Sequence, residues 1–140
     1  MITIGIDPGQ KGGIVAITDN RKVIVSEVMP TIGGKEIDAP GLREILYSLK
    51  CQATEQNVPI TAFLEKVRAR PGQGVVSMFT FGRGLGIVEG VIAGLQIPSQ
   101  QVIPGTWVKE MHEGLDLRLN PKARSLLVVR RLYPNLNLLS

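Results

Sequence analysis

The sequence predicts an α/β domain built on a mixed five-stranded sheet, in which three antiparallel strands are followed by parallel strands and helices flank the sheet. Three observations indicate this class. Short apolar runs joined by tight turns fill residues 1–29, helical patterns then alternate with isolated apolar runs, and the last third of the chain is mainly helical. The 140 residues fit one domain, and 44% hydrophobic with 20% charged residues is ordinary globular composition.

The first strands form a predicted antiparallel meander. Residues 1–7 alternate isoleucine with small or polar residues and end in the turn Asp7-Pro8-Gly9. Residues 12–18 and 22–29 are the next two strands, joined by a turn at residues 19–21. Strands joined by such tight turns run antiparallel.

The middle of the chain alternates helices and strands. Apolar residues at helical spacing predict a helix up to about residue 56, with Asp38 as its cap. Residues 59–66 are a buried strand, parallel to the first because a helix intervenes. A basic, glycine-rich loop follows, and then a helix over residues 76–96 that is apolar on all sides and is therefore expected to pack on several partners.

The last third contributes one strand and two helices. Residues 99–103 are the fifth strand, and Pro104 opens a short helix that carries Trp107. Pro121 opens another helix, which extends to Leu132.

Composition narrows the kinds of site that the chain can hold. Cys51 and His112 are the only cysteine and the only histidine, which excludes an internal disulfide and a zinc site of the usual type. A metal would therefore be held by oxygen ligands. The net charge of +4 favours an anionic partner. No apolar run approaches the roughly 20 residues of a membrane span, so we expect a cytoplasmic protein without a membrane partner.

Two carboxylates are the strongest chemical feature. Asp7 ends the first strand, and Glu65 ends the strand expected beside it. Two such carboxylates would repel each other unless a cation lies between them, and oxygen ligands select Mg²⁺, with Mn²⁺ as a substitute. Both residues also have purely structural interpretations: Asp7 could only accept a hydrogen bond from the turn that follows it, and Glu65 could form an ion pair with Lys66 or Arg68.

Several motifs resemble those of RuvC-like Holliday junction resolvases, in particular their phage and bacterial branch. They are the run from Gly5 to Gly9 followed by Gly12-Gly13, Glu65 at a strand end, and the segment from Pro71 to Gly82. The likeness covers nearly the whole chain. It implies an RNase H-like fold, a four-way DNA junction as substrate, Mg²⁺ bound by Asp7 and Glu65, and a homodimer that cuts two opposed strands. The chain would act at the nucleoid, or in a host cytoplasm if it is phage-encoded.

The chain departs from the family at one point. The family has one or two further acidic residues on a C-terminal helix, whereas no acid follows Asp116 here. Glu113 and Asp116 precede the helix at Pro121 and come too early. The sequence could be a piece of a longer protein, or it could belong to a relative that binds junctions without cutting them.

Basic and amide side chains are the candidate DNA contacts. The loop after Glu65 would lie beside the metal site, and its glycines would let the main chain approach DNA. Phe79 or Phe81 is a candidate wedge between bases, and the small-residue helix over residues 76–96 a candidate dimer surface. We expect DNA contacts from Lys11, Arg68, Arg70, Gln73, Lys122 and Arg124.

Two other functions share these motifs. An aspartate followed by a glycine-rich hairpin also opens the actin-like kinases and ATPases, although those need two such domains. A ribosomal RNA-processing nuclease of the same fold would differ in its substrate.

Overall fold

A computed structural model describes residues 1–137. The chain divides into two compact units, Met1–Val102 and Ile103–Ser140, and each is described by itself. The prediction of a single domain over the whole chain stays a prediction.

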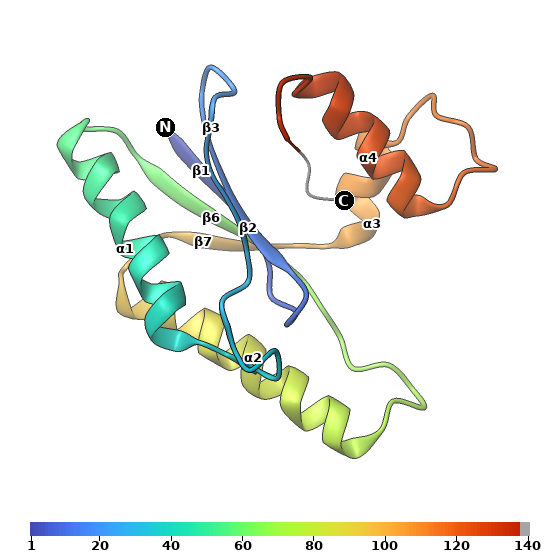
Figure 1. The fold of residues 1–140 in the computed structure, drawn as a ribbon, viewed down its shortest axis with the longest axis horizontal. Coiled ribbons are helices and arrows are strands. Elements are labelled where there is room, and N and C mark those ends of the chain that lie inside the picture. The colour runs from blue at the N-terminus through green and yellow to red at the C-terminus, as the bar shows by residue number, and fades with distance from the viewer. Residues whose placement is uncertain (138–140) are drawn as a thin grey trace. The chain divides into compact units, whose positions relative to one another are not determined.

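The first unit is built on a five-stranded sheet in the order β3-β2-β1-β6-β7 (Figure 1). The three N-terminal strands pair antiparallel, whereas β1–β6 and β6–β7 pair parallel, so the predicted mixed sheet is confirmed. Each strand lies within about two residues of its predicted position. The strands are β1 (Ile2–Asp7), β2 (Gly13–Thr18), β3 (Val23–Val28), β6 (Ile60–Glu65) and β7 (Ser99–Val102).

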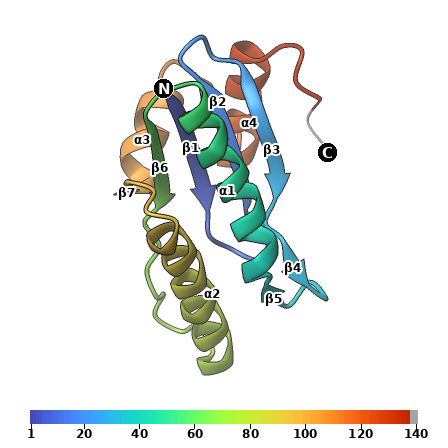
Figure 2. The same ribbon diagram turned by 90° about the vertical axis from the view of Figure 1, so that its left-hand side faces the viewer.

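Two helices, α1 (Ala39–Glu55) and α2 (Val75–Gly94), lie along one face of the sheet (Figure 2). Asp38 caps α1 as predicted, because its Oδ1 accepts a hydrogen bond of 3.2 Å from the Gly41 N–H. The core lies between this face and the helices, and burying these side chains is the main favourable term in folding. It includes Ile2, Ile4, Ile6, Ile14, Leu42, Leu46, Leu49, Leu64, Val88 and Ile92.

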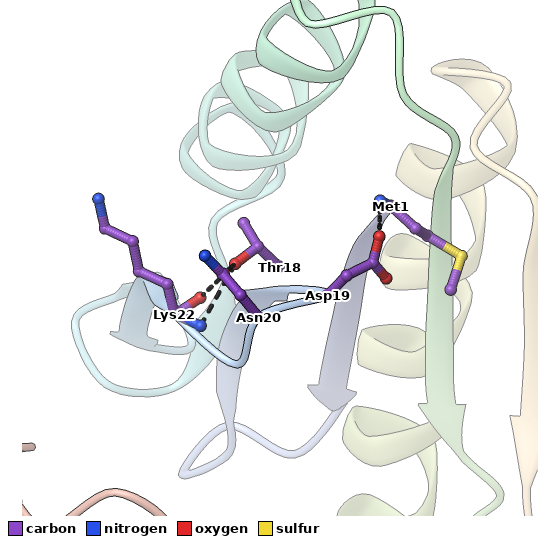
Figure 3. A network of polar contacts seen from close by, with 5 residues as sticks. All are labelled: Met1, Thr18, Asp19, Asn20 and Lys22. Atoms are coloured by element: carbon purple, nitrogen blue, oxygen red, sulfur yellow. Dashed lines mark hydrogen bonds and ion pairs between the residues drawn. The ribbon is translucent and has the colours of Figure 1, made fainter.

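The turn between β2 and β3 lies beside the N-terminal end of β1, at the end of the sheet away from Asp7 (Figure 3). The Thr18 N–H donates to the Lys22 carbonyl at 3.0 Å, and the Lys22 N–H donates to the Thr18 hydroxyl at 3.3 Å. The Met1 ammonium group pairs with Asp19 in the same turn. Lys22 and Asp19 are therefore charged residues in an ordered turn far along the strands from Asp7.

A small hairpin was not predicted from the sequence. It consists of β4 (Thr31–Ile32) and β5 (Glu36–Ile37), which pair antiparallel with each other and form a separate two-stranded sheet. Strands of two residues carry too little periodicity to be recognised.

The helix α2 differs from its prediction in its surroundings. It was expected to be packed on several partners, but only Gly84, Val88 and Ile92 are buried. The helix has 20 residues and is long and apolar enough to cross a membrane by length and composition alone, contrary to the expectation that no run approaches that length. The helix instead packs one stripe on the core and leaves apolar residues exposed, Val75 and Phe79 among them.

The second unit contains α3 (Pro104–Met111) and α4 (Pro121–Leu132), both at their predicted positions. His112, at the end of α3, is buried, and its Nε2 lies 2.9 Å from the Ser125 hydroxyl on α4. The Trp107 ring meets the His112 ring edge-on, with centroids 6.4 Å apart. His112 is therefore a buried packing residue between the two helices of this unit.

Candidate metal and nucleic-acid site

The strand register places the two predicted carboxylates in one row across the sheet. Asp7 pairs with Gly13 of β2, and Glu65 pairs with Val102 of β7. Between these pairs, β1 and β6 run parallel with Ile6 opposite Leu64, so the next residues of the two strands are Asp7 and Glu65. Neighbouring strands lie about 4.8 Å apart, which brings the two carboxylates within reach of a single ion.

Both carboxylates project from the face opposite the core. Ile6 and Leu64 are buried under α1 and α2, and side chains alternate along a strand, so Asp7 and Glu65 point to the other face. Asp7 is exposed and Glu65 is half-buried. The strand ends therefore hold the acids rigidly while leaving them accessible.

Burial and the Asp7 carboxylate both affect the ionisation of Glu65. Burial raises the pKa of Glu65 above its usual value, and the nearby Asp7 carboxylate raises it further. A divalent cation between the two groups would relieve this repulsion.

The turn after β1 is packed tightly around Asp7. The Gly9 N–H donates to Asp7 Oδ1 at 3.1 Å, as expected if Asp7 has a structural role in its own turn. Gly12 passes directly against Asp7: a Cβ at Gly12 would lie 2.2 Å from the Asp7 carbonyl oxygen and 2.9 Å from its Cγ. Only glycine permits this approach. The sequence showed the glycine pair at residues 12 and 13, but not that it fixes Asp7.

The donor set fits Mg²⁺ in part. Two adjacent carboxylates supply hard oxygen ligands, and Mg²⁺ usually keeps several waters beside one or two carboxylates. Within residues 1–137 no group of three or more His, Cys, Asp or Glu side chains could hold a metal.

Glu113 and Asp116, the acids nearest to the C-terminus, do not join this pair in the described residues. Arg118 donates hydrogen bonds of 2.8 to 3.1 Å to Asp116, and these bonds lower the pKa of the Asp116 carboxyl group. Glu113 is exposed in the second unit.

The basic loop leaves the sheet from the same strand end as Glu65. Arg68 and Arg70 follow β6 and are exposed. Gln73 is engaged within the chain, because its Nε2 donates to the Ser77 hydroxyl at 3.2 Å and its Oε1 accepts from the Arg70 N–H at 3.5 Å. Gln73 thus ties the loop to the first turn of α2.

The remaining predicted contacts lie in two places. Lys11 is exposed in the turn after Asp7. Lys122 and Arg124 lie in the first turn of α4 in the second unit, where the Arg124 Nε is buried without a hydrogen-bond partner. DNA contact by these residues stays a prediction.

Comparisons with known proteins support the fold. The structure is similar to that of Thermus thermophilus RuvC in complex with a Holliday junction substrate, with a TM-score of 0.62, 18% identity, and coverage of 96% of this chain and 79% of that one. A second structure of Thermus thermophilus RuvC gives a TM-score of 0.57 at 20% identity, covering 96% of this chain and 81% of that one. No family model and no curated protein matches the sequence. The chain therefore has the RuvC type of RNase H-like fold.

Proposed function

We propose that the chain is a Mg²⁺-dependent endonuclease that resolves four-way DNA junctions. The observation that carries this proposal is the adjacent pair Asp7 and Glu65 at the ends of two parallel strands in a RuvC fold. The structure with a TM-score of 0.62 is that of a RuvC in complex with a Holliday junction substrate. This likeness supports branched DNA as the substrate class. A cytoplasmic location without a membrane partner is part of the same proposal.

Asp7 and Glu65 would hold the metal, with Mn²⁺ as a substitute for Mg²⁺. A metal bound there supplies an activated water and neutralises charge on the phosphate during phosphodiester hydrolysis. The protein's contribution is orientation: Gly12 and the Gly9 N–H fix the Asp7 carboxylate, and the strand pairing fixes Glu65 beside it.

The loop after β6 would hold the DNA backbone next to these acids. Arg68 and Arg70 are exposed cations on the chain segment that continues from Glu65, and guanidinium groups suit phosphate oxygens. Gln73 would act on Arg70, because it accepts a bond from the Arg70 N–H and donates to Ser77. A DNA strand bound at the two carboxylates would thus lie next to the positively charged Arg68 and Arg70, which follow β6.

A homodimer would place two such sites for two opposed cuts. The exposed face of α2 suits a second copy of the chain, because Val75, Val76 and Phe79 are 84%, 79% and 71% exposed. Further along, the helix is exposed at glycines where an added Cβ would meet nothing within 4 Å, which permits close helix approach. These glycines are spaced by four residues at 82, 86, 90 and 94.

A junction-binding protein that does not cut is the second candidate. It is favoured by one observation: the described residues bring together two carboxylates that could bind a metal, and no third candidate ligand. This candidate keeps the same fold and the same DNA surface, but predicts no metal-dependent product.

One assay separates the two candidates. A labelled four-way junction and a linear duplex are incubated with the protein in Mg²⁺ or in EDTA, and both retention and cutting are measured. The proposal predicts selective binding and symmetric, Mg²⁺-dependent cuts. Asp7→Asn should abolish cutting and leave binding intact, because it removes a ligand and a negative charge. The matched control is Asp19→Asn, an aspartate in the turn at the opposite end of the strands.

Selective binding without cuts would favour the second candidate. Equal cutting by the Asp7→Asn variant would remove Asp7 from the mechanism, and no preference for the junction over duplex would overturn both candidates.

A further inference from the structure

The hairpin β4–β5 leaves the sheet at the same end as the two carboxylates. Asp7 pairs with Gly13, and Gly13 pairs with Val28, where β3 ends. The hairpin begins three residues later, at Thr31. Figure 2 shows the hairpin and the loop after β6 beyond the same end of the sheet, on opposite sides of β1. The two segments therefore flank the strand that carries Asp7.

The hairpin has a short, well-defined tip. Gly33 and Gly34 have φ angles of 60° and 69°, and the Lys35 N–H donates to the Ile32 carbonyl at 3.2 Å. Ile32 pairs with Glu36, so Gly33, Gly34 and Lys35 form the three-residue connection of the hairpin, and glycine adopts the positive φ at its first two positions readily. Lys35 is the last residue of this connection, and its side chain is exposed.

Two side chains connect the hairpin to the turn after Asp7 and to α2. The Gln10 amide donates to the Lys35 carbonyl, which joins the hairpin to the turn that follows Asp7. Arg83 of α2 forms an ion pair with Glu36. These groups line a cavity of about 200 Å³ between the turn, the hairpin and α2. The backbone at Lys35 is thus tied to the Asp7 turn and does not depend on the two-residue strands alone.

Below the tip, the hairpin is also fixed by packing. Ile37 is buried, and it lies so close to α2 that a Cβ at Gly84 would be 3.2 Å from its Cγ1. The hairpin is therefore a rigid support for the charge that it carries.

The charges on this surface leave two lysines without an opposite partner. Arg83 and Glu36 neutralise each other through their ion pair. Lys35 on the hairpin and Lys11 on the Asp7 turn form no ion pair within residues 1–137. Gln10 joins the hairpin that carries Lys35 to the turn that follows Asp7 and carries Lys11, so the two lysines lie on connected segments.

We propose that Lys35 and Lys11 form a second phosphate-binding surface, on the side of the carboxylates opposite the loop of Arg68 and Arg70. Its ligand is the phosphodiester backbone of a nucleic-acid strand that passes across the site. Lys35 contacts the phosphate, and Gln10 is a positioning residue that acts through the Lys35 backbone. The inference rests on the proposed function, which it deepens by giving the bound strand positive charge on both sides.

The salt dependence of binding tests this surface. Anisotropy titrations in EDTA, over a range of salt concentrations, measure the affinity of the full chain for a labelled junction and for a linear duplex. Loss of one phosphate contact lowers the slope of log K against log salt by about 0.9 for duplex DNA. Lys35→Ala should show this reduction on both DNAs, because phosphate contacts carry no sequence information. Lys22→Ala, at the opposite end of the strands, should not.

A double-mutant cycle tests the role of Gln10. Gln10→Ala should weaken binding while wild-type Lys35 is present, and should add little once Lys35 is alanine, because both changes affect one contact. Full additivity would show that Gln10 does not act through Lys35.

The outcomes distinguish this inference from the proposed function. If the wild type binds DNA but Lys35→Ala keeps the slope of Lys22→Ala, the second phosphate surface is refuted and the proposed nuclease stands. If the wild type binds DNA with no junction preference and no cutting, while Lys35→Ala still lowers the slope, the surface stands and the resolvase proposal fails. Absence of any DNA binding overturns both.

Discussion

Replacing Gly12 with alanine should damage the site by displacing Asp7. The added Cβ would lie 2.2 Å from the Asp7 carbonyl oxygen, and real Cβ contacts are essentially never shorter than 3.0 Å, so the two segments must separate by about 0.8 Å. Gly12 cannot move away freely, since its N–H donates to Gly9 and its carbonyl accepts from the Met29 N–H, both at 2.9 Å.

The magnitude follows from this overlap. Overpacking costs about 1–3 kcal/mol, and the upper end applies because the opposing atom is backbone and not a flexible side chain. For a chain of this size that corresponds to a melting temperature roughly 10 °C lower. A displacement near 1 Å can reduce catalysis about 10²-fold, so cutting should fall by that order in protein that is still folded.

The assay compares Gly12→Ala with Gly9→Ala in the same turn. A Cβ at Gly9 would lie 3.4 Å from Asp7 Oδ1, which is ordinary contact, so this variant should be close to wild type. Denaturant unfolding measures stability, and the increase in melting temperature on adding Mg²⁺ measures the metal site without relying on cutting. The reasoning is refuted if the two variants have equal stability and an equal response to Mg²⁺.

Three further expectations concern other parts of the chain. Glu65→Gln should stabilise the metal-free protein at neutral pH and remove its response to Mg²⁺ in melting experiments: the folded-state pKa of Glu65 is raised, so its contribution to stability is lost as pH rises through that pKa. Gly86→Leu on the exposed face of α2 should change the association state in sedimentation experiments, and an unchanged state would remove that face from the dimer. Ser125→Ala should cost about 1 kcal/mol in denaturant unfolding, because it leaves the buried His112 Nε2 without its partner.

Local signals in the sequence were enough to predict the strands and the carboxylate pair. The alternating isoleucines of β1 end at Asp7, and the apolar run of β6 ends at Glu65, so parallel pairing alone brings the acids together. The helix cap at Asp38 could also be predicted from the sequence, because the residue that donates to it is only three positions away.

What the sequence concealed depends on contacts between distant segments. Lys35 gave no signal, because its position is set by a glycine turn between two-residue strands and by a bond from Gln10. The exposure of α2 was also hidden: its apolar composition indicates burial, but a sheet of this width contacts only one stripe of a 20-residue helix. Gly12 was recognised as part of a motif, whereas the close approach that requires it appears only in three dimensions.

The pairing of β1 with β6 has a consequence for folding kinetics. Asp7 and Glu65 are far apart in the sequence, and β2, β3, the hairpin and α1 lie between them. Parallel pairs of this kind are slow to form, because the intervening chain must be ordered first. If this pairing forms after the folding transition state, a metal that needs both carboxylates binds only afterwards. Mg²⁺ should then slow unfolding and leave the folding rate nearly unchanged, so the ion would protect the finished fold without helping to build it.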